Sequence, residues 1–180
     1  MTTRDPSAKS HTISVLVENQ FGVLARISGL FSARGYNIDS LCVGVTDDPT
    51  ISRMTVVVKG DDRVLDQIVN QLNKLPEVIE VIDLTKQDFV DRELIMIKIS
   101  VEGSSRSGLL EVVEIFRARV CDVSPLTLTV EATGSDGKLQ AFIDMVRPFG
   151  IVELARTGKI AIARAPRITR EQTQSQGRKD

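Results

Sequence analysis

The chain has 180 residues, of which 42% are hydrophobic and 26% charged, and its formal net charge is −1. A chain of this kind can bury one ordinary hydrophobic core or two small ones. The near-neutral charge gives no basic surface for a phosphate backbone, and the 4% of aromatic residues are too few to stack on bases. We therefore expect a globular protein that does not bind nucleic acid.

The expected location follows from two features of the sequence. No apolar run reaches the roughly 18–20 residues that span a bilayer. The segment from Met1 to Ser10 is polar and lacks the apolar middle of a signal peptide. We therefore expect a soluble cytoplasmic protein that does not bind membranes.

The first half of the chain predicts six elements in the order βαββαβ. The turn of the hairpin contains Asp47, Asp48 and Pro49, a combination that favours a turn over a pair of catalytic carboxylates. Asp61 or Asp62 is expected to cap the second helix, and Gly35 to end the first. From the apolar spacing, the elements are a strand at 13–17, a helix at 23–31, strands at 38–45 and 54–58, a helix at 64–75 and a strand at 78–84.

Apolar periodicity lapses before Leu94 and then resumes, which indicates a linker at 86–92. The second half repeats the order of the first. Ser135 or Asp136 is expected to cap its second helix, and Pro148 to stop it. The elements are a strand at 94–101, a helix at 109–116, strands at 120–123 and 126–130, a helix at 139–146 and a strand at 151–154.

The fold class is therefore α+β, with two ferredoxin-like βαββαβ domains in tandem, each with two helices on one face of a four-stranded antiparallel sheet. Domains of about 75 residues have marginal cores, so contact between domains or oligomerisation is expected. The predicted organisation is a flexible N-terminus at 1–10, a first domain at 11–85, the linker at 86–92, a second domain at 93–164 and a disordered tail at 165–180.

Metal and disulfide chemistry is not expected. Cys42 and Cys121 lie far apart without CxxC spacing, and we interpret both as reduced core thiols. His11 has no second histidine or nearby cysteine with which to share a metal. It is interpreted as a surface or strand-end residue, and no metal site is predicted.

Catalytic groups are also lacking. Residues 134–138 (GSDGK) are too short between the glycines for a phosphate loop and fit a helix cap better. Residues 104–108 (SSRSG) could hold an anion at a helix start, although serine is also a common capping residue. No nucleophile, base and orienting group can be assembled, so we predict no catalytic residues and expect a binding function.

The most suggestive segment joins the first strand to the first helix, residues 18–27 (ENQFGVLARI). Gly22 allows a ligand to approach the backbone, and the free N–H groups of a first helical turn suit a carboxylate. The side chain of Asn19 could reach an ammonium or carboxylate group. Spacing alone leaves open both a ligand site and an ordinary capped helix start.

This segment, 15–19 (VLVEN) and 22–26 (GVLAR), closely resembles the corresponding part of ACT domains, small ligand-binding modules of amino-acid metabolism. A longer pattern resembles the regulatory subunits of acetohydroxyacid (acetolactate) synthase in particular. It comprises 29–41 (GLFSARGYNIDSL), 46–49 (TDDP), 52–55 (SRMT), 92–94 (REL), 114–117 (EIFR), 134–139 (GSDGKL) and 152–158 (VELARTG).

The resemblance implies a non-catalytic regulatory subunit in branched-chain amino acid biosynthesis. It implies a homodimer whose first domain is an ACT domain that binds valine, or a related branched-chain amino acid, at the dimer seam. The partner would be the catalytic large subunit, which is activated by the second domain and carries the cofactors thiamine diphosphate, Mg²⁺ and FAD. No cofactor is expected on this chain.

Carried over by position, the resemblance implies six effector-binding residues. Asn19, Gly22, Val23 and Leu24 would hold the ligand from one subunit, and Asn37 and Ile38 would close the site from the other. The alternative interpretations are a turn at the helix start, plain core, and a turn before a strand.

Two other functions stay open at this point. One is a free-standing amino-acid sensor that controls a different partner, and the other is an enzyme in its own right. The lack of catalytic groups argues against the enzyme.

Overall fold

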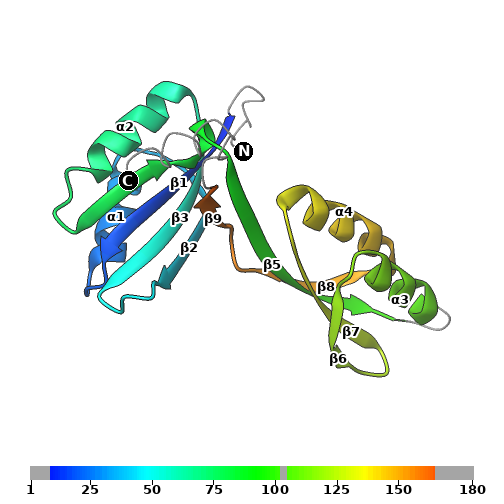
Figure 1. The fold of residues 1–180 in the computed structure, drawn as a ribbon. Coiled ribbons are helices and arrows are strands. Elements are labelled where there is room, and N and C mark those ends of the chain that lie inside the picture. The colour runs from blue at the N-terminus through cyan, green and yellow to red at the C-terminus, as the bar shows by residue number, and fades with distance from the viewer. Residues whose placement is uncertain (1–8, 102–104, 165–180) are drawn as a thin grey trace, which may run out of the picture.

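The computed structural model describes residues 9–101 and 105–164, which form two sheet-and-helix units in tandem (Figure 1). Both sheets are antiparallel, and each unit follows the order βαββαβ. The predicted α+β class and the two ferredoxin-like domains are therefore confirmed. The predicted disordered tail at 165–180 lies outside the described residues, as do residues 1–8 of the predicted flexible N-terminus, whereas Lys9 and Ser10 already belong to the first strand.

The first unit has a four-stranded sheet in the order β2-β3-β1-β4 with both helices on one face. Its elements are β1 (Lys9–Glu18), α1 (Val23–Ala33), β2 (Ile38–Val45), β3 (Ile51–Gly60), α2 (Asp62–Leu72) and β4 (Val78–Asp83), followed by the short 3₁₀ helix η1 (Leu84–Lys86). The alternating residues of β1 form the core with the helices, as predicted. That core comprises Ile13, Val15, Val17, Val23, Ile27, Phe31, Met54, Val56, Val58, Leu65, Ile68 and Leu72.

The second unit has the corresponding strand order β6-β7-β5-β8. Its elements are β5 (Phe89–Ser100), α3 (Ser105–Ile115), β6 (Arg119–Val123), β7 (Thr127–Gly134), α4 (Asp136–Val146), η2 (Arg147–Phe149), β8 (Ile151–Arg156) and β9 (Ile160–Ala163). The core residues come from β5, β7 and the two helices, and include Ile95, Ile97, Ile99, Leu109, Leu128, Val130, Leu139, Phe142 and Val146.

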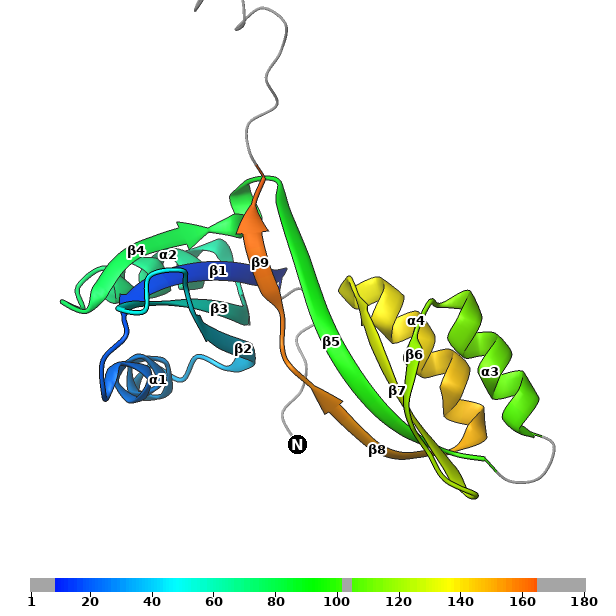
Figure 2. The ribbon, with the colours of Figure 1, turned by 60° about the horizontal axis from the view of Figure 1, so that its bottom comes forward.

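Strand β5 connects the two units directly. It begins at Phe89, inside the range expected to be a linker, and its first four residues pair with β9 from Phe89↔Ala163 to Arg92↔Ile160. The rest of β5 is the central strand of the second sheet. Sequence analysis does not predict β9. The two strands form a ribbon beside the first sheet, and β9 contacts β1 (Figure 2).

The helix ends show which residues fix the local geometry. Asp61 caps α2, and its carboxylate accepts a hydrogen bond from the backbone N–H of Val64 at 2.8 Å. Ser135 is the N-cap residue of α4, although its side chain makes no capping hydrogen bond. Gly35 adopts φ +70° immediately after α1, as expected of a glycine that ends a helix.

Three sequence-based interpretations of single residues are corrected. Cys42 is only half-buried and Cys121 is exposed, so neither is a core thiol. His11 lies near the start of β1 but is buried, and its Nε2 donates to the carbonyl oxygen of Gly60 at 3.1 Å. A sequence pattern could not show this burial, because the neighbours of His11 come from distant segments.

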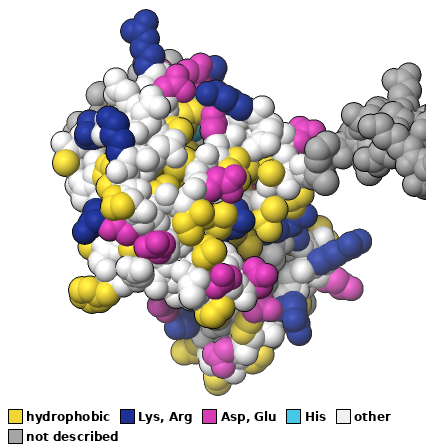
Figure 3. Space-filling model, turned by 60° about the vertical axis from the view of Figure 1, so that its left-hand side comes forward, with side chains coloured by type: hydrophobic (Ala, Val, Ile, Leu, Met, Phe, Trp, Pro, Cys, Tyr) yellow, Lys and Arg dark blue, Asp and Glu magenta, His cyan; other side chains and the backbone are white. Residues whose placement is uncertain are grey.

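Within the described residues, no helix is long and apolar enough to cross a membrane. The same part of the chain contains no cluster of His, Cys, Asp or Glu able to hold a metal ion. The face presented in Figure 3 has Lys and Arg side chains interspersed with Asp and Glu.

Candidate functional site

The start of α1 is built around Gly22. This N-cap residue has φ +87°, and α1 has no side-chain capping bond. The first-turn amides of Leu24 and Ala25 have no acceptor within a helix that starts here. They can therefore donate to an anionic group, with the positive end of the helix dipole favouring a carboxylate.

The loop before α1 is held against the β2–β3 turn. The backbone N–H of Asn19 donates to the Thr50 carbonyl oxygen at 2.7 Å, and its side-chain Nδ2 donates to the Pro49 carbonyl oxygen at 2.9 Å. Thr50 in turn donates to the carboxylate of Asp48, which lowers the pKa of that carboxyl group. Asn19 is therefore fixed in place, and its Oδ1 is the atom able to accept from an ammonium group.

The two apolar residues at the helix start have different surroundings. Val23 is buried in the core of the first unit, whereas Leu24 is 45% exposed. Phe21, in the preceding loop, is fully exposed. Of these three side chains, Leu24 and Phe21 are the ones accessible to a ligand or a second protein chain.

Asn37 and Ile38 lie at the opposite end of α1. Ile38 pairs with Val58 of β3, whereas Glu18 at the other end of the sheet pairs with Ile51. Seven residues along β3 correspond to roughly 24 Å at ~3.4 Å per residue. One chain therefore does not bring Asn37 and Ile38 to Gly22, and a single site containing both groups requires two copies.

The β2 strand lies at one edge of the first sheet, where Val43 and Val45 are exposed. The backbone groups on the outer side of an edge strand can pair with another strand. This edge therefore offers a place at which two copies could join their sheets.

In two other segments considered in the sequence, the basic side chain donates to backbone carbonyl oxygens. The ammonium group of Lys138 donates to the carbonyl oxygen of Thr133 at 3.0 Å, so it folds back onto β7. The guanidinium group of Arg106 donates to the carbonyl oxygens of Ser124 and Pro125. Ser104, the first residue of the other segment, lies outside the described residues.

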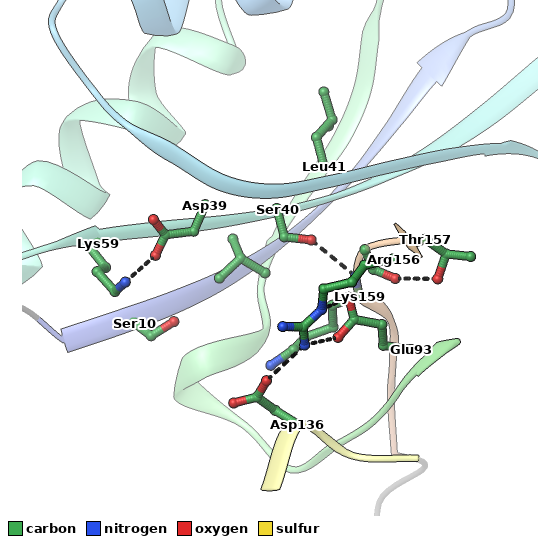
Figure 4. Close-up of a pocket in the computed structure, with 12 residues that line it drawn as sticks. Ser10, Asp39, Ser40, Leu41, Lys59, Glu93, Asp136, Arg156, Thr157 and Lys159 are labelled. Atoms are coloured by element: carbon green, nitrogen blue, oxygen red, sulfur yellow. Dashed lines mark hydrogen bonds and ion pairs between the residues drawn. The ribbon is translucent and has the colours of Figure 1, made fainter. Parts of the chain in front are cut away.

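Sequence analysis misses a polar cavity of about 670 Å³ between the two units (Figure 4). Its walls carry ion pairs that join Lys59 to Asp39, and Arg156 to Glu93 and Asp136. The cavity forms from segments distant in the chain. Residues 157–159, which form part of its wall, lie in a stretch for which the sequence predicts no helix or strand.

Comparison with known proteins extends the description of the fold. Residues 13–80 match the family described as AHAS small subunit-like ACT domain, and residues 92–165 match the family described as small subunit of acetolactate synthase. The chain is thus a two-domain protein whose first domain is an ACT domain.

Similar full-length proteins are acetolactate synthase small subunits. The one from Mycobacterium bovis is 52% identical over 161 residues, which cover 89% of this chain and 96% of that protein. The one from Aquifex aeolicus is 46% identical over 172 residues, covering 95% and 90% of the two chains. The crystal structure of the small subunit from Thermotoga maritima has a TM-score of 0.80 and 38% identity, and covers 87% of this chain and 98% of that chain. The chain belongs to the acetolactate synthase small subunit family.

Proposed function

We propose that this chain activates the catalytic large subunit of acetolactate synthase and makes it sensitive to feedback inhibition by valine. The observation that carries the proposal is the similarity over both domains to proteins named as small subunits of that enzyme. In this proposal the chain binds no cofactor. Thiamine diphosphate, Mg²⁺ and FAD belong to the catalytic partner, and the C-terminal domain is the part that activates it.

The proposed effector site lies at the seam of a homodimer. The carboxylate of valine accepts hydrogen bonds from the amides near Gly22 and Leu24, and its ammonium group donates to Asn19 Oδ1. Asn37 and Ile38 come from the second copy, which accounts for their position at the far end of α1 within one chain. Burial of the isopropyl group contributes about 1.5–3 kcal/mol to binding.

The first test is acetolactate formation by a purified catalytic subunit, titrated with this chain in the presence and absence of valine. We expect the chain to raise the rate and valine to cancel the gain. No change in rate with a cognate catalytic subunit would contradict the proposal. It would favour a sensor that controls a different partner.

The site itself is tested by Gly22→Asp, with Gly22→Asn as the matched control. Aspartate and asparagine tolerate a positive φ better than other side chains do. A Cβ at position 22 meets no atom within 4 Å. Only Asp places a negative charge beside the ligand carboxylate. We expect Gly22→Asp to abolish the valine response without loss of activation, and Gly22→Asn to keep a response. Equal valine inhibition in wild type and Gly22→Asp would mean that this loop is not the site.

A further inference from the structure

The β8–β9 turn of the second unit contacts β2 of the first unit directly. The backbone N–H of Lys159 donates to the hydroxyl oxygen of Ser40 at 3.0 Å (Figure 4). Gly158 has φ +83°, and a Cβ there would lie 2.8 Å from Ser40 Oγ and 3.3 Å from the carbonyl oxygen of Leu41. Both the backbone conformation and the close approach therefore require glycine at position 158.

The turn is fixed firmly to the second unit. The backbone N–H of Thr157 donates to the Leu94 carbonyl oxygen at 3.1 Å, and the Thr157 hydroxyl accepts from the Leu94 N–H at 3.1 Å. One residue earlier, Arg156 makes two hydrogen bonds, of 3.0 and 2.6 Å, to the carboxylate of Glu93. Any displacement of the turn is therefore expected to move the start of the second sheet with it.

The other side of the contact lies next to the proposed effector site. Ile38 pairs with Val58, but Ser40 pairs with Val57, so the register of β2 is irregular at Asp39. The Asp39 carboxylate accepts from Asn37 Nδ2 at 3.0 Å and is paired with Lys59 Nζ at 2.7 Å. Irregular positions are places where a strand can change direction locally. A ligand that engages Asn37 or Ile38 therefore acts on the short segment that also holds Ser40.

We propose that the contact of Ser40 with Gly158 and Lys159 couples effector occupancy at the start of β2 to the position of the C-terminal domain. This inference rests on the proposed function, because it assumes a ligand at Asn37 and Ile38. Allosteric coupling requires the ligand to bind two arrangements with different affinity. In this proposal the Ser40 contact supplies the difference in affinity, because the contact exists only while β2 and the β8–β9 turn keep their present spacing.

The test uses Ser40→Ala, which removes the acceptor, and Gly158→Ala, which pushes the turn away from β2. Their controls are Ser32→Ala, at an exposed position of α1, and Gly137→Ala, where a Cβ meets no atom within 4 Å. Each variant is assembled with the catalytic subunit. Activation without valine, the residual rate at saturating valine, and valine binding to the small subunit by calorimetry are measured.

We expect both test variants still to activate the enzyme and still to bind valine. Their residual rate at saturating valine should rise by about fivefold, the factor that one net hydrogen bond of about 1 kcal/mol represents. Hydrogen exchange at the Lys159 amide should be faster in Ser40→Ala. The two controls should match the wild type in all of these measurements.

The outcomes separate the inference from the function on which it rests. A wild-type complex that valine neither binds nor inhibits would overturn the proposed function and this inference with it. If valine inhibits the wild-type complex and the Ser40→Ala complex equally, the proposed coupling through Ser40 is wrong, while the proposed function stands. Ser40→Ala is the milder change, so its result decides the matter if Gly158→Ala does not fold.

Discussion

The ion pair between Arg156 and Glu93 is expected to stabilise the second unit more than the exposed pairs do. The Glu93 side chain is only 9% exposed, and both of its carboxylate oxygens accept from Arg156. The substitution Arg156→Met keeps most of the side-chain length but leaves the buried carboxylate without its cation. The hydrogen bond to Glu93 also raises the pKa of Arg156.

The magnitude follows from burial. Removal of one partner from a fully buried pair costs about 3–5 kcal/mol. The Arg156 side chain is 36% exposed, so water reaches part of the site, and we expect a loss of about 1–3 kcal/mol. For a chain of this length each kcal/mol shifts Tm by roughly 2–4 °C.

The assay is urea unfolding followed by far-UV circular dichroism, because the chain has no tryptophan and one tyrosine. The matched control is Lys98→Met, which removes the exposed pair of Lys98 with Glu153 at 2.9 Å. We expect a much smaller loss there, and one that salt abolishes. The double variant Glu93→Gln with Arg156→Met should be more stable than Arg156→Met alone, since no unpaired buried charge remains. Equal losses for Arg156→Met and Lys98→Met at the same protein concentration would refute the reasoning.

Two further predictions concern single hydrogen bonds. Asp61→Ala should lower the free energy of unfolding, measured in urea, by about 1 kcal/mol, because the cap of α2 is lost. Ser135→Ala should lower it less, because the Ser135 side chain makes no capping hydrogen bond. Equal losses in the two variants would contradict this prediction. Thr50→Val removes the hydroxyl that most lowers the Asp48 pKa, so NMR titration should show that pKa rising. The lowered pKa stabilises the fold above the ordinary Asp pKa, and this contribution is lost as the pH falls through the folded-state value. An Asp48 pKa that is the same in Thr50→Val and in the wild type would contradict this prediction.

Most of the fold could be predicted because its signals are local. The alternation of Ile13, Val15 and Val17 indicated β1, and the positive φ of Gly35 and the cap at Asp61 followed from residue type. Strand β9 was missed because the strand at 151–154 already completed the expected βαββαβ order, so no element was assigned between it and the tail. Its partner, the start of β5, carries Asp91 and Arg92 and was interpreted as a linker.

The candidate site could be predicted only through family resemblance. Gly22 and Asn19 have physical properties that suit a ligand, but the same properties suit a helix start. Nothing local connects them with Asn37, which lies at the far end of the sheet. The Ser40 contact was out of reach for a similar reason, because its partner is 119 residues away in the chain.

The helix-free face of the first sheet carries polar side chains that are nevertheless buried. Thr12, Ser14 and Thr55 point away from the helices, where alternation predicts exposed side chains, yet they are 4%, 1% and 2% exposed. The ribbon of β5 and β9 runs beside this face (Figure 2). Ala161 of β9 is 2% exposed. Strand β9 therefore contacts β1 of the first unit while it pairs with β5, and these contacts connect the two units.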